Sequence, residues 1–197
     1  ARVAADLGVS KIRLTGGEPL LDKRLDRLVS GLAKISGVDD LALTTNAMLL
    51  APVAQKLADT VLHRVTISLD SLDERVFRLM SGGRGDLSKV MDGIAAAQDA
   101  GLSPVKINVV VQRGVNDHTV IDLLDHFRGS GHIVRLIEFM DVGNRNGWRQ
   151  DQVVPSRQLL EQVQQRWPLR RVDQSYPGEV ARRYEYIYGQ GEVGFIS

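Results

Sequence analysis

The chain has 197 residues, of which 43% are apolar and 25% are charged, which is ordinary for a globular protein and argues against disorder. A formal net charge of +1 gives no overall field that would recruit nucleic acid or an anionic membrane. The absence of cysteine excludes disulfides, thiolate zinc sites and Cys-ligated clusters within these residues. No apolar run reaches the roughly 18–20 residues that span a bilayer, so we expect a cytoplasmic protein with no membrane contact.

The first residues resemble the end of an amphipathic helix that stops at Gly8, with no initiating Met and no signal peptide. The last residues complete a predicted hairpin at Ser197. We therefore expect both ends to be cut in mid-fold.

Short β-branched runs alternate with amphipathic helical patterns, and apolar residues crowd these runs as in strands covered on both faces. One helix is expected after the N-cap Asp22, and another begins with a capping box of Ser71 and Glu74. The alternation predicts βα units on a parallel sheet, either an open doubly wound sheet or part of a barrel. The predicted strands are 11–15, 41–45, 64–69, 105–111 and 133–139.

The pattern changes after Asp141. A helix is predicted from about 156 to 167, where Pro168 stops it. Two strands at 182–187 and 192–196 then form a predicted hairpin.

Ligands of parallel α/β folds bind at the carboxyl ends of the strands. Gly16 and Gly17 follow the first strand and would let a ligand approach the backbone closely, although an ordinary βα turn explains them equally well. Residues 44–46 end the second strand and could bind a ligand or cap the next helix, and Ser68 at the end of the third can point into the mouth.

Several cations are predicted on the inward faces of these strands. Lys11 and Arg13 share one face of the first strand, Lys106 shares one with Asn108 on the fourth, and Arg135 lies on the fifth. Inward cations in a nearly neutral protein indicate a polyanionic small ligand. The sequence has no Gly-x-Gly-x-x-Gly after a strand and no Walker motif, and its four histidines form no metal-ligand motif.

Five ordered motifs together resemble the radical S-adenosylmethionine GTP 3′,8-cyclase family of molybdenum cofactor biosynthesis. Gly-Gly-Glu-Pro alone marks only the radical S-adenosylmethionine superfamily, whereas the order and spacing of all five are specific to the cyclases. They are KIRLTGGEPLL at 11–21, LALTTNA at 41–47, RVTISLDSLDERVFRLMSG at 64–82, VKINVVVQRGVND at 105–117 and RLIEFMDVGNRNGW at 135–148.

The resemblance implies an α/β fold, an incomplete (β/α)₆ TIM-like barrel that lacks its first βα unit, followed by the start of a smaller C-terminal domain. We expect residues 1–148 to form the partial barrel. Residues 149–197 would begin the C-terminal domain with a helix and a β-hairpin.

The resemblance also implies roles for individual residues. S-adenosylmethionine would be held by Gly16, Gly17, Ser68 and Met140, with Arg135 a weaker candidate. The Gly17 backbone would meet the methionine amino group, and the Met140 thioether would pack on the adenine. The substrate GTP would contact Arg13, Thr44 and Lys106, with Lys11 a weaker candidate.

Enzymes of this family use two [4Fe-4S] clusters and S-adenosylmethionine to make a 5′-deoxyadenosyl radical. The radical takes the 3′ hydrogen of GTP, and the resulting carbon radical attacks C8 of guanine to give (8S)-3′,8-cyclo-7,8-dihydroguanosine 5′-triphosphate. The barrel orients the reactants and excludes water. The implied partners are GTP and the next enzyme of the molybdopterin pathway, and a homodimer is left open.

The sequence departs from the family in lacking both cysteine sets, which in the family precede and follow the region matched here. We therefore expect the chain alone to be inactive, with no catalytic residue and no metal ligand of its own. Two alternatives are a non-catalytic nucleotide-binding or interaction module on the same barrel and a neighbouring radical S-adenosylmethionine enzyme with another substrate.

Overall fold

The computed structural model describes residues 1–141, 147–174 and 179–197, and the chain falls into two compact units. The first unit comprises residues 1–68 and 86–105, and the second comprises residues 69–85 and 106–197. In the part of the chain that the structure describes, no helix is both long and apolar enough to cross a membrane.

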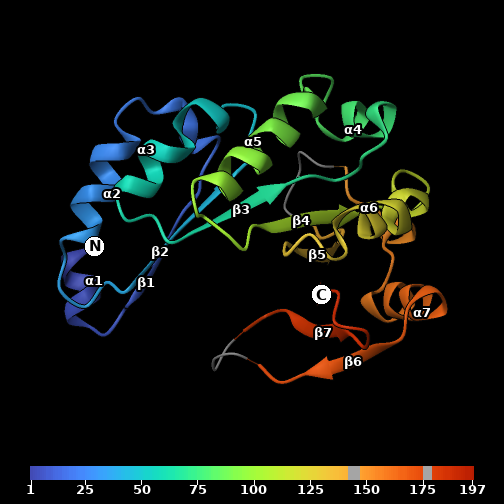
Figure 1. Ribbon diagram of the computed structural model, residues 1–197. Helices are drawn as coiled ribbons and strands as arrows, with labels where there is room; N and C mark the ends of the chain where they lie inside the picture. Colours follow the sequence, from blue (N-terminus) through green and yellow to red (C-terminus); the bar gives the residue numbers. More distant parts are fainter. Residues whose placement is uncertain (142–146, 175–178) are drawn as a thin grey trace. The chain divides into compact units, whose positions relative to one another are not determined.

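The first unit contains three parallel strands, in the order β1, β2, β3. The register places Arg13 beside Ala42 and Thr44 beside Thr66. Helices α2, α3 and α5 lie along one side of these strands (Figure 1). The elements are α1 (Arg2–Asp6), β1 (Lys11–Leu14), η1 (Pro19–Leu21), α2 (Leu25–Ala33), β2 (Asp40–Thr45), η2 (Ala51–Val53), α3 (Ala54–Asp59), β3 (Arg64–Ser68) and α5 (Leu87–Asp99).

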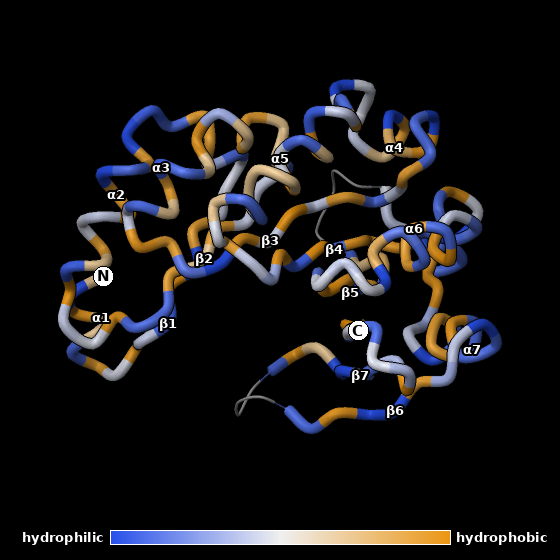
Figure 2. The backbone as a smooth tube through the Cα atoms, viewed as in Figure 1, coloured by the Kyte–Doolittle hydropathy of each residue, from blue (hydrophilic) through white to orange (hydrophobic). Residues whose placement is uncertain are grey.

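The core of the first unit forms between the strands and these helices. Leu41, Leu43, Val65 and Ile67 are fully buried, and the helices alternate apolar and polar residues along their length (Figure 2). Burial of each such side chain contributes about 1.5–3 kcal/mol. Gly93 of α5 lets that helix approach the loop after β2, because a Cβ there would lie 2.6 Å from the Ala47 carbonyl oxygen.

The second unit combines parallel and antiparallel strands. Strand β4 pairs parallel with β5, and β5 pairs parallel with β8. Strand β7 joins β8 in an antiparallel hairpin, and β6 pairs antiparallel with β7. The elements are α4 (Glu74–Met80), β4 (Lys106–Val111), η3 (Asp117–Thr119), α6 (Val120–Phe127), β5 (Ile133–Glu138), η4 (Gln150–Gln152), α7 (Ser156–Arg166), β6 (Leu169–Val172), β7 (Arg182–Tyr186) and β8 (Glu192–Ile196).

These units confirm the predicted α/β class with mostly parallel strands, and the predicted hairpin is present. The sequence did not predict β6, nor the pairing of β8 with β5. The predicted division at residues 148 and 149 concerns the family's domains and stays a prediction.

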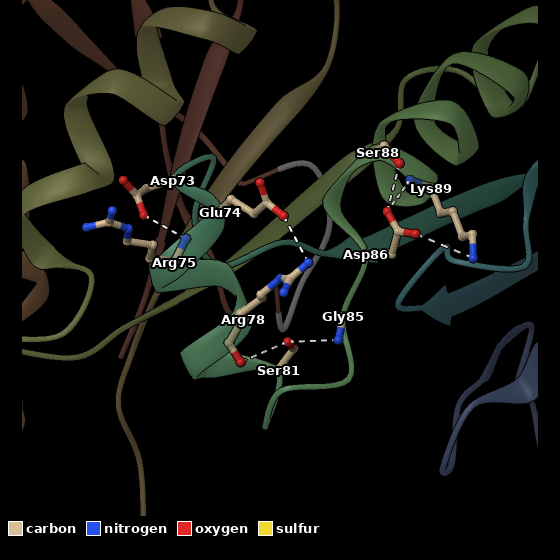
Figure 3. Close-up of polar contacts among 9 residues, drawn as sticks. All are labelled: Asp73, Glu74, Arg75, Arg78, Ser81, Gly85, Asp86, Ser88 and Lys89. Carbon is tan, nitrogen blue, oxygen red and sulfur yellow. Dashed lines mark hydrogen bonds and ion pairs between the residues drawn. The ribbon is translucent and has the colours of Figure 1, made fainter.

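Two helix starts differ from the prediction. The N-cap of α4 is Asp73, whose Oδ1 accepts a hydrogen bond from the Arg75 amide at 2.9 Å (Figure 3). The same oxygen accepts from the Val76 amide at 3.0 Å. The predicted capping box is wrong because α4 begins at Glu74, so that Ser71 lies before the N-cap. Ser71 Oγ accepts from the Asp73 amide at 3.0 Å and donates to Thr119 Oγ1 at 2.9 Å. Likewise Asp22 does not cap α2, which begins at Leu25.

Candidate functional site

The turn after β1 borders a hollow of about 240 Å³. Gly16 has a φ of +147°, which favours glycine. A Cβ built on Gly16 or Gly17 meets no atom within 4 Å, so the space over the backbone is open. The residues that line the hollow all belong to the first unit and are Thr15, Gly16, Gly17, Glu18, Thr44, Thr45, Asn46 and Ser68. Backbone and side-chain polar groups from three strand ends therefore surround one opening.

Arg13 is tied to a wall of this hollow. Its Nη1 donates to Thr44 Oγ1 at 3.1 Å and to Thr66 Oγ1 at 3.0 Å. Thr66 is 2% exposed, so the second hydrogen bond anchors the guanidinium to a buried point on β3. These two hydrogen bonds hold the exposed Arg13 guanidinium on the same face of the strands as Thr44.

Glu18 is the residue of this site that sequence reasoning missed. Its Oε1 accepts from Thr45 Oγ1 at 2.6 Å and from the Leu20 amide at 3.1 Å. Its Oε2 accepts from the Asn46 amide at 2.8 Å. The carboxylate therefore joins the Gly16–Gly17 turn to the end of β2. The sequence did carry a signal for this role. Glu18 is a lone carboxylate after the first strand, and the next strand ends in the hydrogen-bond donors Thr45 and Asn46.

The other predicted residues of the first unit are placed differently. Ser68 is exposed and lines the hollow at the end of β3. Lys11 is exposed at the start of β1 and does not line the hollow. It lies on the same face as Arg13 but about 7 Å further from the turn, by the usual rise of a strand.

The second unit holds the remaining predicted residues. Arg135 on β5 donates from Nε to Asn108 Oδ1 on the neighbouring strand β4, at 2.9 Å. On its other side a Cβ at Gly194 would lie 3.1 Å from Arg135 Cγ, so glycine leaves room for the arginine. Lys106 is half-buried at the start of β4, and Met140 is 47% exposed after β5.

Asp70, which belongs to the second unit, has a shifted pKa. Burial raises the pKa of this carboxyl to about 6, against the lowering effect of the Val110 amide that donates to Oδ1 at 2.8 Å. Beside it, the fully buried Asn116 donates from Nδ2 to the carbonyls of Asp70 and Val110, each at 2.8 Å. This polar network fixes the chain after Ser68 against β4.

Among the described residues, no three His, Asp or Glu side chains gather closely enough to hold a metal ion. The chain also offers no thiolate, because it contains no cysteine.

Two family profiles match the chain. The profile of the radical SAM superfamily (SAM is S-adenosylmethionine) matches residues 1–127, and that of Molybdenum Cofactor Synthesis C matches residues 132–197. A relative from Xanthomonas campestris pv. campestris strain B100, named GTP 3′,8-cyclase, is 54% identical over 196 residues. That match covers 100% of this chain and 58% of the relative.

A second relative of the same name, from Acidothermus cellulolyticus, is 50% identical over 96% of this chain and 52% of its own length. The chain thus spans little more than half of these curated relatives.

Solved structures of similar fold have much lower sequence identity. A domain of pyruvate-formate lyase-activating enzyme from Bacteroides vulgatus is 22% identical, with a TM-score of 0.59 over 78% of this chain and 90% of that one. Methylornithine synthase is 15% identical, with a TM-score of 0.63 over 83% of this chain and 50% of that one. At such identities the likeness concerns the fold alone.

Proposed function

Because the chain belongs to the radical SAM superfamily, we propose that the hollow at the ends of β1, β2 and β3 binds S-adenosylmethionine. The observation that carries the proposal is the open backbone of Gly16 and Gly17, over which a side chain would find empty space. A ligand amino group and carboxylate need such exposed carbonyl and N–H groups. The Ser68 hydroxyl at the rim adds a further donor and acceptor.

We propose further that the chain is the central part of a GTP 3′,8-cyclase in molybdenum cofactor biosynthesis. The name of its relatives supports the proposal, as does the match to Molybdenum Cofactor Synthesis C. Arg13, held by Thr44 and Thr66, would bind GTP as a fixed cation. Lys106 is a further proposed GTP contact, Lys11 a weaker one, and Met140 and Arg135 are proposed cofactor contacts.

The chemistry would come from the cofactors of the family rather than from this chain's side chains. In the family, S-adenosylmethionine and an iron–sulfur cluster would supply the radical chemistry. The proposed part of this chain is to bind and orient the reactants and to exclude water from them. We propose that the cyclic product passes to the next enzyme of the pathway, and a homodimer stays a proposal.

The absence of cysteine does not fit cluster binding by these 197 residues. We therefore expect the chain alone to be inactive, so that its binding face is to be tested by binding rather than by turnover. Anaerobic iron–sulfur reconstitution should leave no stoichiometric cluster absorbance. A stable, stoichiometric cluster on this chain would refute this part of the proposal.

Gly17→Ala tests the cofactor site. The added methyl group meets no protein atom within 4 Å, and Gly17 does not lie in the left-handed region. The variant should therefore fold as well as the unchanged chain, while its methyl group obstructs a ligand on the backbone. Calorimetric titration with S-adenosylmethionine should show affinity reduced about tenfold or more. Unchanged affinity in a folded variant would contradict the site.

Arg13→Ala tests the substrate site, with Arg24→Ala as the matched control. Arg24 is also an exposed arginine, but its guanidinium pairs with Asp22 away from the hollow. Loss of a charged hydrogen-bonding partner should weaken GTP binding about tenfold or more in Arg13→Ala and leave it unchanged in Arg24→Ala. Equal GTP affinity in both variants would count against a cyclase and favour a superfamily member with another substrate.

A further inference from the structure

We propose that a hollow beside strands β6 and β7 binds a ligand with a di- or triphosphate group, through the guanidinium groups of Arg171 and Arg182. The hollow has a volume of about 250 Å³ and lies within the second unit. Arg183, Asp173 and Ala181 also line it. The inference goes beyond the proposed function, because it uses none of the residues that are assigned to S-adenosylmethionine or GTP.

The sequence carries the pair Arg-Arg twice, at 170–171 on β6 and at 182–183 on β7. Successive side chains of a strand point to opposite faces of a sheet, so each pair places one arginine on each face. The antiparallel register of the two strands sets Arg171 opposite Tyr184 (Figure 1). Arg182 lies two residues before Tyr184 on β7, so Arg171 and Arg182 share one face. The other arginine of each pair lies on the opposite face.

On that opposite face both arginines have carboxylate partners. Arg170 forms an ion pair with Glu185, which lies opposite it on β7. Arg183 Nη2 lies 2.8 Å from Glu192 Oε1, and Glu179 lies 3.9 Å from the same guanidinium. The positive charges of this face are therefore neutralised inside the protein.

The face of Arg171 and Arg182 has no such partners. In the described part of the chain no Asp or Glu forms an ion pair with either guanidinium. Residues 142–146 and 175–178, which lie outside that part, contain no acidic side chain. Asp173 lines the hollow, but it is exposed and pairs with neither arginine. Two positive charges therefore border one hollow without a carboxylate partner from the chain.

The backbone geometry sets the spacing of these two arginines. Arg171 lies diagonally across the strand pair from Arg182, and such diagonal neighbours are about 7–8 Å apart in antiparallel sheets. Arg182 Nη2 donates to Ser197 Oγ at 3.2 Å, a neutral acceptor that leaves the positive charge of the guanidinium in place. The small side chain of Ala181 is 5% exposed and leaves room above it. Both guanidiniums can therefore reach one ligand.

A di- or triphosphate group matches this arrangement in charge and in shape. Each guanidinium presents a planar fork of N–H donors, which binds phosphate oxygens through paired hydrogen bonds. Two like charges at this spacing repel each other, so a ligand with at least two negative charges stabilises the pair more than a ligand with one. The ion pair of Arg183 with Glu192 would remain and form one wall of the site.

The experiment titrates inorganic pyrophosphate into the isotope-labelled chain and follows the amide signals by NMR. The signals of residues 171, 173, 181 and 182 should shift in a saturable manner. Acetate, which carries a single charge, should require about tenfold more ligand for the same shifts. Absence of saturable shifts at these amides up to about 10 mM pyrophosphate would overturn the inference.

Three glutamine variants test the two arginines. Arg171→Gln and Arg182→Gln should each weaken pyrophosphate binding about tenfold or more, because each removes a charged hydrogen-bonding partner. Arg170→Gln is the matched control, since it removes the same charge from the same strand pair but on the face where Glu185 is the partner. All three side chains are exposed, so the variants should fold. Equal losses in all three would indicate unspecific attraction by net charge and overturn the inference.

A further titration distinguishes two sources of the phosphate group. GTP and pyrophosphate are compared in Arg13→Ala, which lacks the proposed substrate contact. If GTP shifts the amides of the β6–β7 hollow at least as strongly as pyrophosphate, the site takes the phosphate tail of a nucleotide. A response to pyrophosphate alone indicates a free inorganic ligand, and either result supports the inference. Loss of pyrophosphate binding in Arg13→Ala, with binding unchanged in Arg171→Gln, would assign the anion to the proposed substrate site and overturn the inference.

Discussion

Replacing Asp70 by Asn should make the protein more stable at neutral pH and not at acidic pH. Burial raises the pKa of the Asp70 carboxyl from 3.8 to about 6. The folded state then binds a proton more tightly than the unfolded state, so stability falls as pH rises from about 4 to about 6. A shift of roughly two pKa units corresponds to about 3 kcal/mol lost above that window.

An Asn side chain keeps the shape of Asp70 and removes its charge. Its Oδ1 can still accept from the Val110 amide, which donates at 2.8 Å in the unchanged protein. The free energy of unfolding of the variant should therefore exceed that of the unchanged protein by up to about 3 kcal/mol at pH 7.5 and by close to nothing at pH 4. Urea unfolding at both pH values gives the two differences directly.

The control is Asp92→Asn, an exposed aspartate on α5, whose effect should be small at both pH values. A variant at position 70 that is less stable than the unchanged protein at pH 7.5 would refute the reasoning. So would the same stability difference at pH 4 and pH 7.5, because the charge of Asp70 would then have no part in it.

Two further predictions concern packing and buried hydrogen bonds. Gly93→Ala should destabilise the protein by about 1–3 kcal/mol in urea unfolding, because its methyl group would lie 2.6 Å from the Ala47 carbonyl oxygen; an unchanged midpoint would show that α5 can shift freely. Asn116→Ala should cost about 2–4 kcal/mol, since it leaves two part-buried carbonyls and the Gln112 amide without their side-chain partner. A loss under about 1 kcal/mol in the same assay would mean that water replaces those contacts.

The parallel strands could be predicted because their signal is local. Runs such as residues 64–69 and 105–111 are rich in β-branched residues and carry an apolar residue at every second position, and helical patterns separate them, which favours βα units. Strand β6 (Leu169–Val172) carries no such signal, since it has four residues and two of them are exposed arginines. It forms because β7 offers a partner, with Glu185 opposite Arg170.

Helix caps show the same limit on a smaller scale. The spacing of Ser71 and Glu74 fits a capping box, yet Ser71 Oγ accepts from the Asp73 amide and donates to Thr119, a residue 48 positions further along the chain. Asp73, two residues later, caps the helix instead. Local spacing identifies candidate caps, and tertiary contacts decide between them.

The candidate site also contains some residues that the sequence predicts and others that it does not. The glycines at 16 and 17, with Thr44 and Ser68, could be chosen from the sequence because the carboxyl ends of parallel strands share one edge. The role of Glu18 depends on the direction of its side chain toward Thr45, which spacing does not encode. The raised pKa of Asp70 likewise depends on burial, which only the folded structure supplies.

The central claim is that the hollow beside Gly16 and Gly17 binds S-adenosylmethionine, and amide NMR tests it most directly. On addition of S-adenosylmethionine to the isotope-labelled chain, the amide signals of Gly16, Gly17, Asn46 and Ser68 should shift in a saturable manner. The Gly17→Ala variant should require about tenfold more ligand for the same shifts. Absence of any shift at these amides, or saturable shifts confined to other parts of the chain, would contradict the account.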